Sequence, residues 1–208
     1  MKNVVVLGKG ALAVKACDWL EKSPDYKLLA VVADMPEPTW TDSISEWAIK
    51  NEVALVTTGK YKDLSETLNI DLAISIFYGK IIKQDFIDRC GDVINLHNSP
   101  LPKYRGVRPI NWALKNNEET HGVTVHRVTK GVDDGPILGQ VVYPIYPEIE
   151  EVEDVYNKAL DYGWLLFKDV MTKYDYVRKH AKPQKGSHPY YSMKIVGYLG
   201  EREGFKRP

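Results

Sequence analysis

The sequence has few cysteines, no long apolar run and no excess charge of either sign. Cys17 and Cys90 lie far apart and form no CxxC or Cys/His cluster, so neither a disulfide framework nor a structural zinc site is expected. No apolar run approaches the roughly 20 residues that span a bilayer, and the run before Gly8 is too short for a signal peptide core. We therefore expect a cytoplasmic protein that does not bind a membrane.

Charge excludes a further class of function. The 28 basic and 28 acidic residues cancel to a formal net charge of zero, which argues against a nucleic-acid partner held by bulk charge. Hydrophobic residues make up 44% of the chain, enough to build a core. The length of 208 residues fits one domain with an appendage. We place a catalytic domain at residues 1–180 and a C-terminal tail at 181–208.

Short apolar runs in the first half alternate with stretches of helical spacing. We expect helices at 11–20 and at 43–51, the second opened by Asp42. The apolar runs predict strands at residues 3–7, 28–33, 53–56, 71–76 and 92–97. Strands of this kind separated by helices indicate an α/β, Rossmann-like fold with a mostly parallel sheet and helices on both faces.

The second half changes character. Residues 122–128 and 137–145 alternate between apolar and polar types, which predicts an antiparallel strand pair near the end of the chain. A short helix is expected at 109–115 and a long amphipathic helix at 150–174. The residues from 182 onward are expected to form a short, loosely structured appendage.

A glycine-containing turn, VVVLGKGAL, follows the first expected strand. Such a turn can present backbone N–H groups to a phosphate at a helix N-terminus, so Gly10 is a candidate substrate-binding residue. The third glycine of the dinucleotide fingerprint is replaced by Ala13, although Asp34 occupies the place of the ribose-binding acid. Dinucleotide binding, phosphate or sugar binding and a purely structural turn all stay open here.

The stretch NLHNSPLPKYRG carries a strand into a kinked loop. Alternate residues of a strand share a face, so Asn95 and His97 point the same way while Leu96 points into the core. An amide and an imidazole placed together at the carboxyl edge of a parallel sheet suit stabilisation of an oxygen that gains negative charge. A polar strand end satisfied by solvent is the alternative.

A second motif, KGVDDGPILGQ, lies between the two alternating strands. Asp133 is a candidate partner for His97, because a carboxylate beside an imidazole orients it. An ordinary Asp-Asp-Gly turn is the alternative. His126, in the preceding strand, is interpreted as a hydrogen-bonded strand residue. The histidines are scattered and no metal site is expected.

Taken together, NLHNSPLPKYRG and HGVTVHRVTKGVDDGPILGQ resemble the formyltransferase family that uses N10-formyltetrahydrofolate, and most of all its sugar N-formyltransferases. Pro100 departs from the leucine usual in the family. The resemblance implies that Asn95, His97 and Asp133 are catalytic. It also implies a folate co-substrate, N10-formyltetrahydrofolate, with no metal. The folate pocket is assigned to Phe77, Tyr78, Gly79, Lys80, Ile81, Ile82, Val132 and Asp134.

The resemblance also limits the acceptor. Methionyl-tRNA formyltransferases carry a further basic domain, and glycinamide ribonucleotide formyltransferases have a first loop rich in Ser and Asn, unlike GKGALA. The wording YRGVRPINWALKNNEETHGVTVHRV is most similar to enzymes that formylate nucleotide-linked amino sugars for bacterial surface polysaccharide such as the O-antigen of lipopolysaccharide. Candidate substrate-binding residues are Gly10, Ser99, Tyr104, Arg105, Arg108 and Tyr190, the last able to stack on a base.

Two alternatives to the sugar N-formyltransferase hypothesis stay open. One is phosphoribosylglycinamide formylation in purine synthesis. The other, of a different class, is a non-catalytic Rossmann-like nucleotide-binding protein, although a binding module has no need of Asn95, His97 and Asp133 together. A homodimer is compatible with the resemblance.

Overall fold

The computed structural model describes residues 1–186 and 188–202 of the chain. The chain forms two compact units, which we describe separately. The N-terminal unit comprises Met1–Leu96 with Arg127–Lys130, and the C-terminal unit comprises His97–His126 and the described residues from Gly131 onward.

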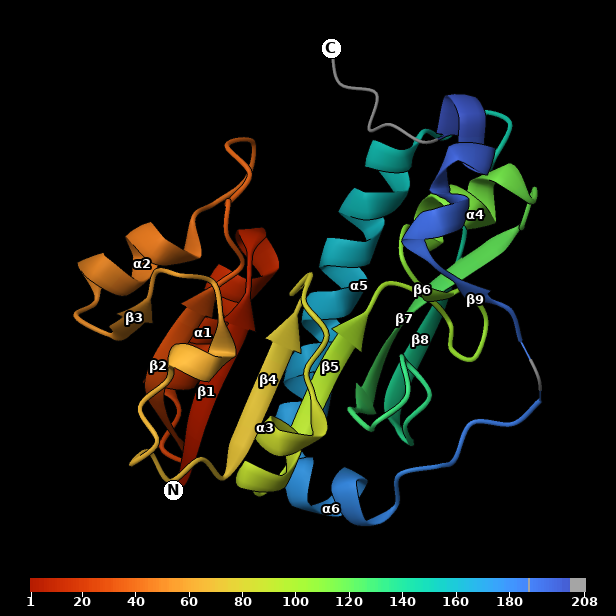
Figure 1. The fold of residues 1–208 in the computed structure, drawn as a ribbon. Helices are drawn as coiled ribbons and strands as arrows, with labels where there is room; N and C mark the ends of the chain where they lie inside the picture. Colours follow the sequence, from red (N-terminus) through yellow and green to blue (C-terminus); the bar gives the residue numbers. More distant parts are fainter. Residues whose placement is uncertain (187, 203–208) are drawn as a thin grey trace. The chain divides into compact units, whose positions relative to one another are not determined.

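The N-terminal unit is built on parallel strands (Figure 1). Their order in the sheet is β3 (Ala54–Val56), β2 (Tyr26–Ala33), β1 (Lys2–Gly8), β4 (Leu72–Ile76) and β5 (Val93–His97). Continuous apolar runs form these strands because residues on both faces are buried, as in Val4–Leu7 and Leu72–Ile76. The last residue of β5, His97, is the first residue of the C-terminal unit.

Helices cover both faces of this sheet, as the sequence predicts. Helix α1 (Gly10–Lys22) packs on β1 and β2, and α2 (Ile44–Lys50) packs on β2 and β3. Val5 and Leu7 of β1 join a core cluster that contains Phe86 of α3 (Gln84–Arg89) and Tyr61 of the 3₁₀ turn η1 (Tyr61–Asp63). The segment between β4 and β5 therefore closes one face of the sheet.

The N-cap of α2 corrects one prediction. Ser43, and not Asp42, is the cap, because its Oγ accepts a hydrogen bond of 3.1 Å from the backbone N–H of Glu46. Helix α3 is absent from the predicted elements, because QDFIDR is too short to show helical periodicity.

The C-terminal unit contains the predicted antiparallel pair, β7 (Thr120–Arg127) and β8 (Ile137–Pro144), in which Val123 is opposite Val141. Helix α4 (Pro109–Lys115) has the predicted bounds. Helix α5 (Val152–Thr172) begins with a capping box between Glu151 and Asp154 and packs on β8 and α4.

The end of the chain contains structure that the sequence did not predict. The expected helix at 150–174 corresponds to α5, which ends at Thr172, and a further short helix, α6 (Tyr174–Lys179), begins after Lys173 leaves the helical conformation. The predicted short C-terminal appendage is present, and it contains regular structure: β9 (Tyr190–Tyr191) pairs in parallel with β6 (Arg105–Gly106), and the 3₁₀ segment η2 (Met193–Arg202) packs on α4. The domain boundary after residue 180 stays a prediction. None of the helices in the described ranges has both the length and the apolar character to cross a membrane.

Candidate active site

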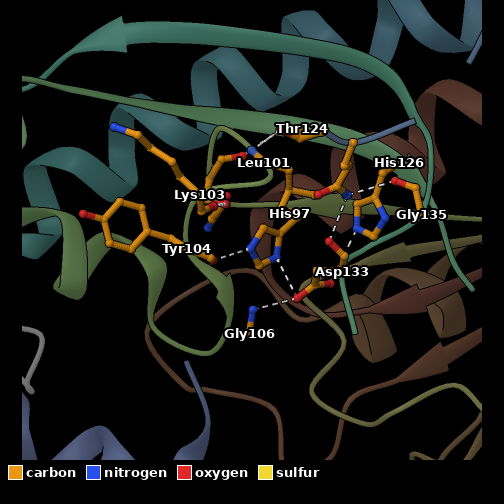
Figure 2. A network of polar contacts seen from close by, with 12 residues as sticks. His97, Leu101, Lys103, Tyr104, Gly106, Thr124, His126, Asp133 and Gly135 are labelled. Atoms are coloured by element: carbon orange, nitrogen blue, oxygen red, sulfur yellow. Dashed lines mark hydrogen bonds and ion pairs between the residues drawn. The ribbon is translucent and has the colours of Figure 1, made fainter. Parts of the chain in front are cut away.

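An imidazole and a carboxylate meet in the C-terminal unit. His97 ends β5, and Asp133 lies in the loop between β7 and β8. Their Nδ1 and Oδ2 atoms are 3.6 Å apart, and His97 is only 7% exposed. Figure 2 shows Asp133 between the rings of His97 and His126. The two motifs singled out in the sequence are therefore brought together by the fold.

The second ring nitrogen of His97 also faces an oxygen. Nε2 is 3.0 Å from the backbone carbonyl oxygen of Tyr104 (Figure 2). A carbonyl and an ionised carboxylate are both acceptors, so only the doubly protonated ring can donate to both. The Tyr104 carbonyl and the Asp133 carboxylate thus hold the ring of His97 at both of its nitrogens.

Asp133 has two further partners. Its Oδ1 is 3.5 Å from Nε2 of His126, and its Oδ2 accepts a hydrogen bond of 2.9 Å from the backbone N–H of Gly106. Burial by itself raises the pKa of the Asp133 carboxyl, but the charge of His97, then His126 and the Gly106 N–H, outweigh it and hold the pKa well below its usual range. Asp133 is therefore an anion at neutral pH.

The loop after His97 is fixed by hydroxyl groups. Ser99 donates to the carbonyl oxygen of Lys103 at 2.7 Å. Thr124 of β7 donates to the carbonyl oxygen of Ser99 at 2.7 Å and accepts from the N–H of Leu101 at 3.2 Å. These bonds hold the kinked loop so that the Tyr104 carbonyl and the Gly106 N–H reach the imidazole and the carboxylate.

Asn95 belongs to the N-terminal unit. It pairs with Ser75 of β4 in the sheet register and is partly buried. It stands two residues before His97 on β5, and alternate residues of a strand share a face. Its predicted catalytic role stays a prediction.

The predicted folate-binding segment follows β4 in the N-terminal unit. Tyr78 donates to the carbonyl oxygen of Gly59 at 2.7 Å, and Ile81 is 68% exposed while Ile82 is buried. Phe77 has the left-handed backbone conformation, with φ of 56°. In the C-terminal unit, Val132 is partly buried and Asp134 is exposed on either side of Asp133. Folate contacts by these residues stay predictions.

The glycine-containing turn is closed by a salt bridge. Asp34, at the end of β2, accepts from Lys9 at 2.6 Å, from Lys80 at 3.1 Å and from the Gly79 N–H at 3.0 Å. Burial by itself raises the pKa of Asp34, but these donors outweigh it and lower the pKa. Gly10 is the first residue of α1 and is buried, with φ of 78°. Asp34 thus balances the two lysines of this turn.

The candidate substrate-binding residues of the C-terminal unit occupy different environments. Ser99 is fully buried. Tyr104 is buried and its hydroxyl donates to Glu118 at 2.8 Å. Arg105 donates to the carbonyl oxygen of His188 at 3.0 Å. Arg108 is exposed and Tyr190 is 46% exposed, so both can be reached by a ligand.

Sequence reasoning missed two contributors to the site. It interpreted His126 as a strand residue, although the histidine lies seven positions before Asp133 at the end of the strand that leads into its loop. It did not single out the backbone N–H of Gly106, since a backbone donor leaves no mark in residue type. Gly106 has φ of 101°, and this conformation favours glycine.

The fold is Rossmann-like, and its C-terminal unit places the imidazole of His97 beside the carboxylate of Asp133. Residues 41–171, well over half of the chain, match the family model described as formyl transferase. The chain belongs to the formyl transferase family, and the predicted family and fold class are confirmed.

Curated relatives fall into two groups. The chain is 35% identical over 149 residues to the bifunctional polymyxin resistance protein ArnA of Wigglesworthia glossinidia brevipalpis, which covers 66% of this chain and 22% of that protein. It is 28% identical over 213 residues to the methionyl-tRNA formyltransferase of Finegoldia magna, covering 97% and 68% respectively. The chain thus spans between about a fifth and about two thirds of these two relatives.

Solved structures give a further comparison. An N-formyltransferase from Helicobacter canadensis in complex with folinic acid and dTDP-3-aminofucose has a TM-score of 0.77 at 26% identity, covering 93% of this chain and 71% of that chain. WlaRD, a sugar 3N-formyltransferase with dTDP and 5-N-formyl-THF, has a TM-score of 0.75 at 29% identity, covering 93% and 70%.

Proposed function

We propose that this protein transfers a formyl group from N10-formyltetrahydrofolate to the amino group of a nucleotide-linked amino sugar. The observation that carries the proposal is the buried His97–Asp133 pair in a member of the formyl transferase family. The two sugar N-formyltransferases described above support the choice of acceptor, because both are more than 25% identical to this chain.

The residues would divide the chemistry as follows. When the acceptor amine attacks the formyl carbon, the formyl oxygen gains negative charge, and donors aimed at it lower the barrier. His97 would exchange its hydrogen bond to the Tyr104 carbonyl for one to that oxygen, and Asn95 would donate a second. Asp133 would hold the imidazolium by its Nδ1 side. The proton that the amine releases would pass to the Asp133 carboxylate, directly or through a water. As the tetrahedral intermediate collapses, the bond between the formyl carbon and N10 would break, and N10 would take a proton from this pair, so that tetrahydrofolate leaves.

The co-substrate supplies an activated formyl group. The exposed Ile81 beside the partly buried rings of Phe77 and Tyr78 gives apolar surface that suits a flat ring system such as a pterin. We assign the folate contacts to the segment 77–82 together with Val132 and Asp134. We assign the nucleotide-sugar contacts to the exposed Arg108 and Tyr190 and to Ser99, Tyr104 and Arg105 of the same unit, and a further contact to Gly10 of the N-terminal unit. Cytoplasmic location and a homodimer stay predictions.

A second acceptor has a specific observation in its favour. Methionyl-tRNA formyltransferase of Finegoldia magna aligns with 97% of this chain. Met-tRNA is therefore a required arm of any acceptor experiment. Phosphoribosylglycinamide formyltransferase from Bacillus halodurans shares the fold at 21% identity and a TM-score of 0.65, which supports the fold alone.

The test is an acceptor panel with N10-formyltetrahydrofolate. It contains dTDP-, UDP- and GDP-linked amino sugars, glycinamide ribonucleotide and Met-tRNA, and formylated product is measured by mass spectrometry. We expect product from at least one nucleotide-linked amino sugar, and none from any acceptor with His97→Ala. Product from the ribonucleotide alone or from Met-tRNA alone would refute the sugar acceptor. Absence of product from every acceptor would refute the proposed activity.

A further inference from the structure

The segment after α6 is hydrogen-bonded to the chain next to the loop that carries Asp133. The N–H of Ile137 donates to the carbonyl oxygen of Lys182 at 2.7 Å, and the N–H of Lys182 donates back to Ile137 at 2.9 Å. Reciprocal bonds of this kind are an antiparallel bridge. We call residues 182–184 and 188–191 the C-terminal clasp. It belongs to the same unit as His97 and Asp133.

Gln184 is the side chain of the clasp that reaches the Asp133 loop. Its amide nitrogen Nε2 donates to the carbonyl oxygen of Asp133 at 2.9 Å and to that of Gly135 at 2.9 Å. Each of the two amide hydrogens forms one of these bonds. If the amide were rotated by half a turn, Oε1 would face the two carbonyl oxygens, and neither bond could form. Within the described residues, Oε1 of Gln184 is buried without a hydrogen-bond partner. Both contacts of Gln184 with this loop are therefore made by its amide nitrogen.

The backbone of Asp133 needs such support. Its φ is 49°, in the left-handed region that residues other than glycine seldom adopt. Gln184 binds the carbonyl of this residue, while the side chain reaches His97 and His126. Fixing the peptide plane therefore fixes the direction in which the carboxylate leaves the backbone (Figure 2).

The clasp also supports the other donor to Asp133. β9 pairs with β6, and the N–H of Val107 donates to the carbonyl oxygen of Tyr191 at 2.9 Å. The ring of Tyr191 packs on those of Tyr104 and Trp112, with centroids 5.3 and 4.9 Å away. A Cβ added at Gly106 would lie 2.2 Å from the Tyr191 carbonyl oxygen, so the two strands are in close contact. The clasp therefore holds both partners of the hydrogen bond from Gly106 to Asp133: β9 pairs with the strand that contains Gly106, and Gln184 binds the backbone of Asp133.

We propose that Gln184 is a positioning residue for Asp133. It sets the angle of the carboxylate toward His97 by binding the backbone carbonyls of Asp133 and Gly135. The inference deepens the proposed function, on which its kinetic readout rests, but its structural readout does not depend on any substrate.

The structural test uses the unliganded protein. The ¹⁵N signals of the His97 and His126 rings are compared in the parent protein, in Gln184→Met and in Asp133→Asn. We expect Gln184→Met to move both sets of signals in the direction of Asp133→Asn. Gln84→Met is the matched control, since Gln84 is an exposed glutamine that bonds Asp88 in the N-terminal unit. Ring signals that stay at their parent positions in Gln184→Met would overturn the proposal.

The kinetic test separates positioning from general stability. We expect Gln184→Met to lower kcat about tenfold while KM for both substrates changes little. In the Asp133→Asn background, Gln184→Met is expected to lower kcat no further. If Gln184 had only a structural role, the kcat losses of the two substitutions would multiply. Multiplying losses would overturn the proposal. If Gln184→Met does not fold, Gln184→Asn, whose amide is one methylene short, replaces it. If the parent protein formylates no acceptor, the proposed function fails and the ring signals decide this inference alone.

Discussion

Two aspartates, one in each unit, are bound in similar ways but by partners of different chemistry. Asp34 accepts from a backbone N–H and from two lysines, at 2.6 and 3.1 Å. Asp133 accepts from a backbone N–H and faces two histidines, at 3.6 and 3.5 Å. In each case basic partners outweigh burial and lower the pKa of the carboxyl.

The partners make the difference. Lysine stays charged across the physiological range, so Asp34 is neutralised permanently and serves the structure. Asp133 faces imidazoles at 3.6 and 3.5 Å, which are longer contacts than those of Asp34 with its lysines. A neutral imidazole can donate from one ring nitrogen and accept at the other, which a lysine ammonium cannot do. The two carboxylates therefore differ in the type of their partners and not in the direction of their pKa shifts.

The largest effect is expected from replacing Asp133. Asp133→Asn removes the negative charge that holds the His97 imidazolium, and we expect kcat for formyl transfer to fall by about 10²–10⁴-fold. Single-turnover kinetics measures the loss. Asp34→Asn is the matched control and is expected to leave kcat within a few-fold. Near-normal turnover by Asp133→Asn would refute the mechanism.

His126 tests whether the second imidazole contributes. His126→Leu removes the contact at Oδ1 of Asp133, and we expect kcat to fall about 10- to 100-fold, the value of a hydrogen bond to a charged group. His126→Gln can place an amide N–H near the same oxygen and is expected to recover most of the rate. Equal rates for the leucine and glutamine variants would show that the contact is dispensable.

Asp34 tests the structural half of the comparison. Asp34→Asn leaves Lys9 and Lys80 without their carboxylate, and we expect a loss of about 1–3 kcal/mol in unfolding free energy, limited by the partial exposure of both lysines. Urea denaturation at pH 7 measures it. Asp85→Asn is the control, because the Lys62–Asp85 pair is exposed on both sides and should contribute nothing measurable.

The same variant has a pH signature. The pKa of Asp34 is lower in the folded protein, so its contribution to stability is present above the ordinary carboxyl pKa of 3.8 and is lost as the pH falls from there through the lower pKa of the folded state. Asp34→Asn should therefore flatten the decline of stability below about pH 4. An unchanged slope would mean that the lysines do not stabilise the carboxylate.

The smallest effect at neutral pH concerns a third histidine, His121, whose ring faces a backbone carbonyl oxygen. Burial lowers the pKa of His121 to about 4, although its Nε2 lies 2.8 Å from the Asn98 carbonyl oxygen. The unfolded chain binds a proton near pH 6.5 and the folded one does not, so stability falls as the pH falls between these values.

We expect this histidine to cost about 2 kcal/mol between pH 7 and pH 5. His121→Gln should remove that part of the slope in urea denaturation. The exposed His180 provides the control, and His180→Gln should leave the slope unchanged. A slope that persists in His121→Gln would show that other groups, and not this buried imidazole, cause the loss of stability.

Local patterns predicted much of this protein correctly. Continuous apolar runs such as Val4–Leu7 mark buried parallel strands, and alternation marks β7 and β8, because side-chain period follows backbone geometry. Short segments without a full period, such as α3 and α6, were missed for the same reason. The kink at Lys173 was missed because the apolar pattern continues through it.

The candidate site was likewise predicted only in part. The residues of NLHNSPLPKYRG and KGVDDGPILGQ are enough to single out His97 and Asp133 by their chemistry, and with them the family. The sequence suggested Asp133 as a partner for His97, but 36 positions separate the two residues (133 − 97), and only the packing of strands places their Oδ2 and Nδ1 atoms 3.6 Å apart. The donors around Asp133 come from a backbone N–H, a strand histidine and Gln184. These lie at distances along the chain that no local pattern encodes, so the tertiary structure alone decided them.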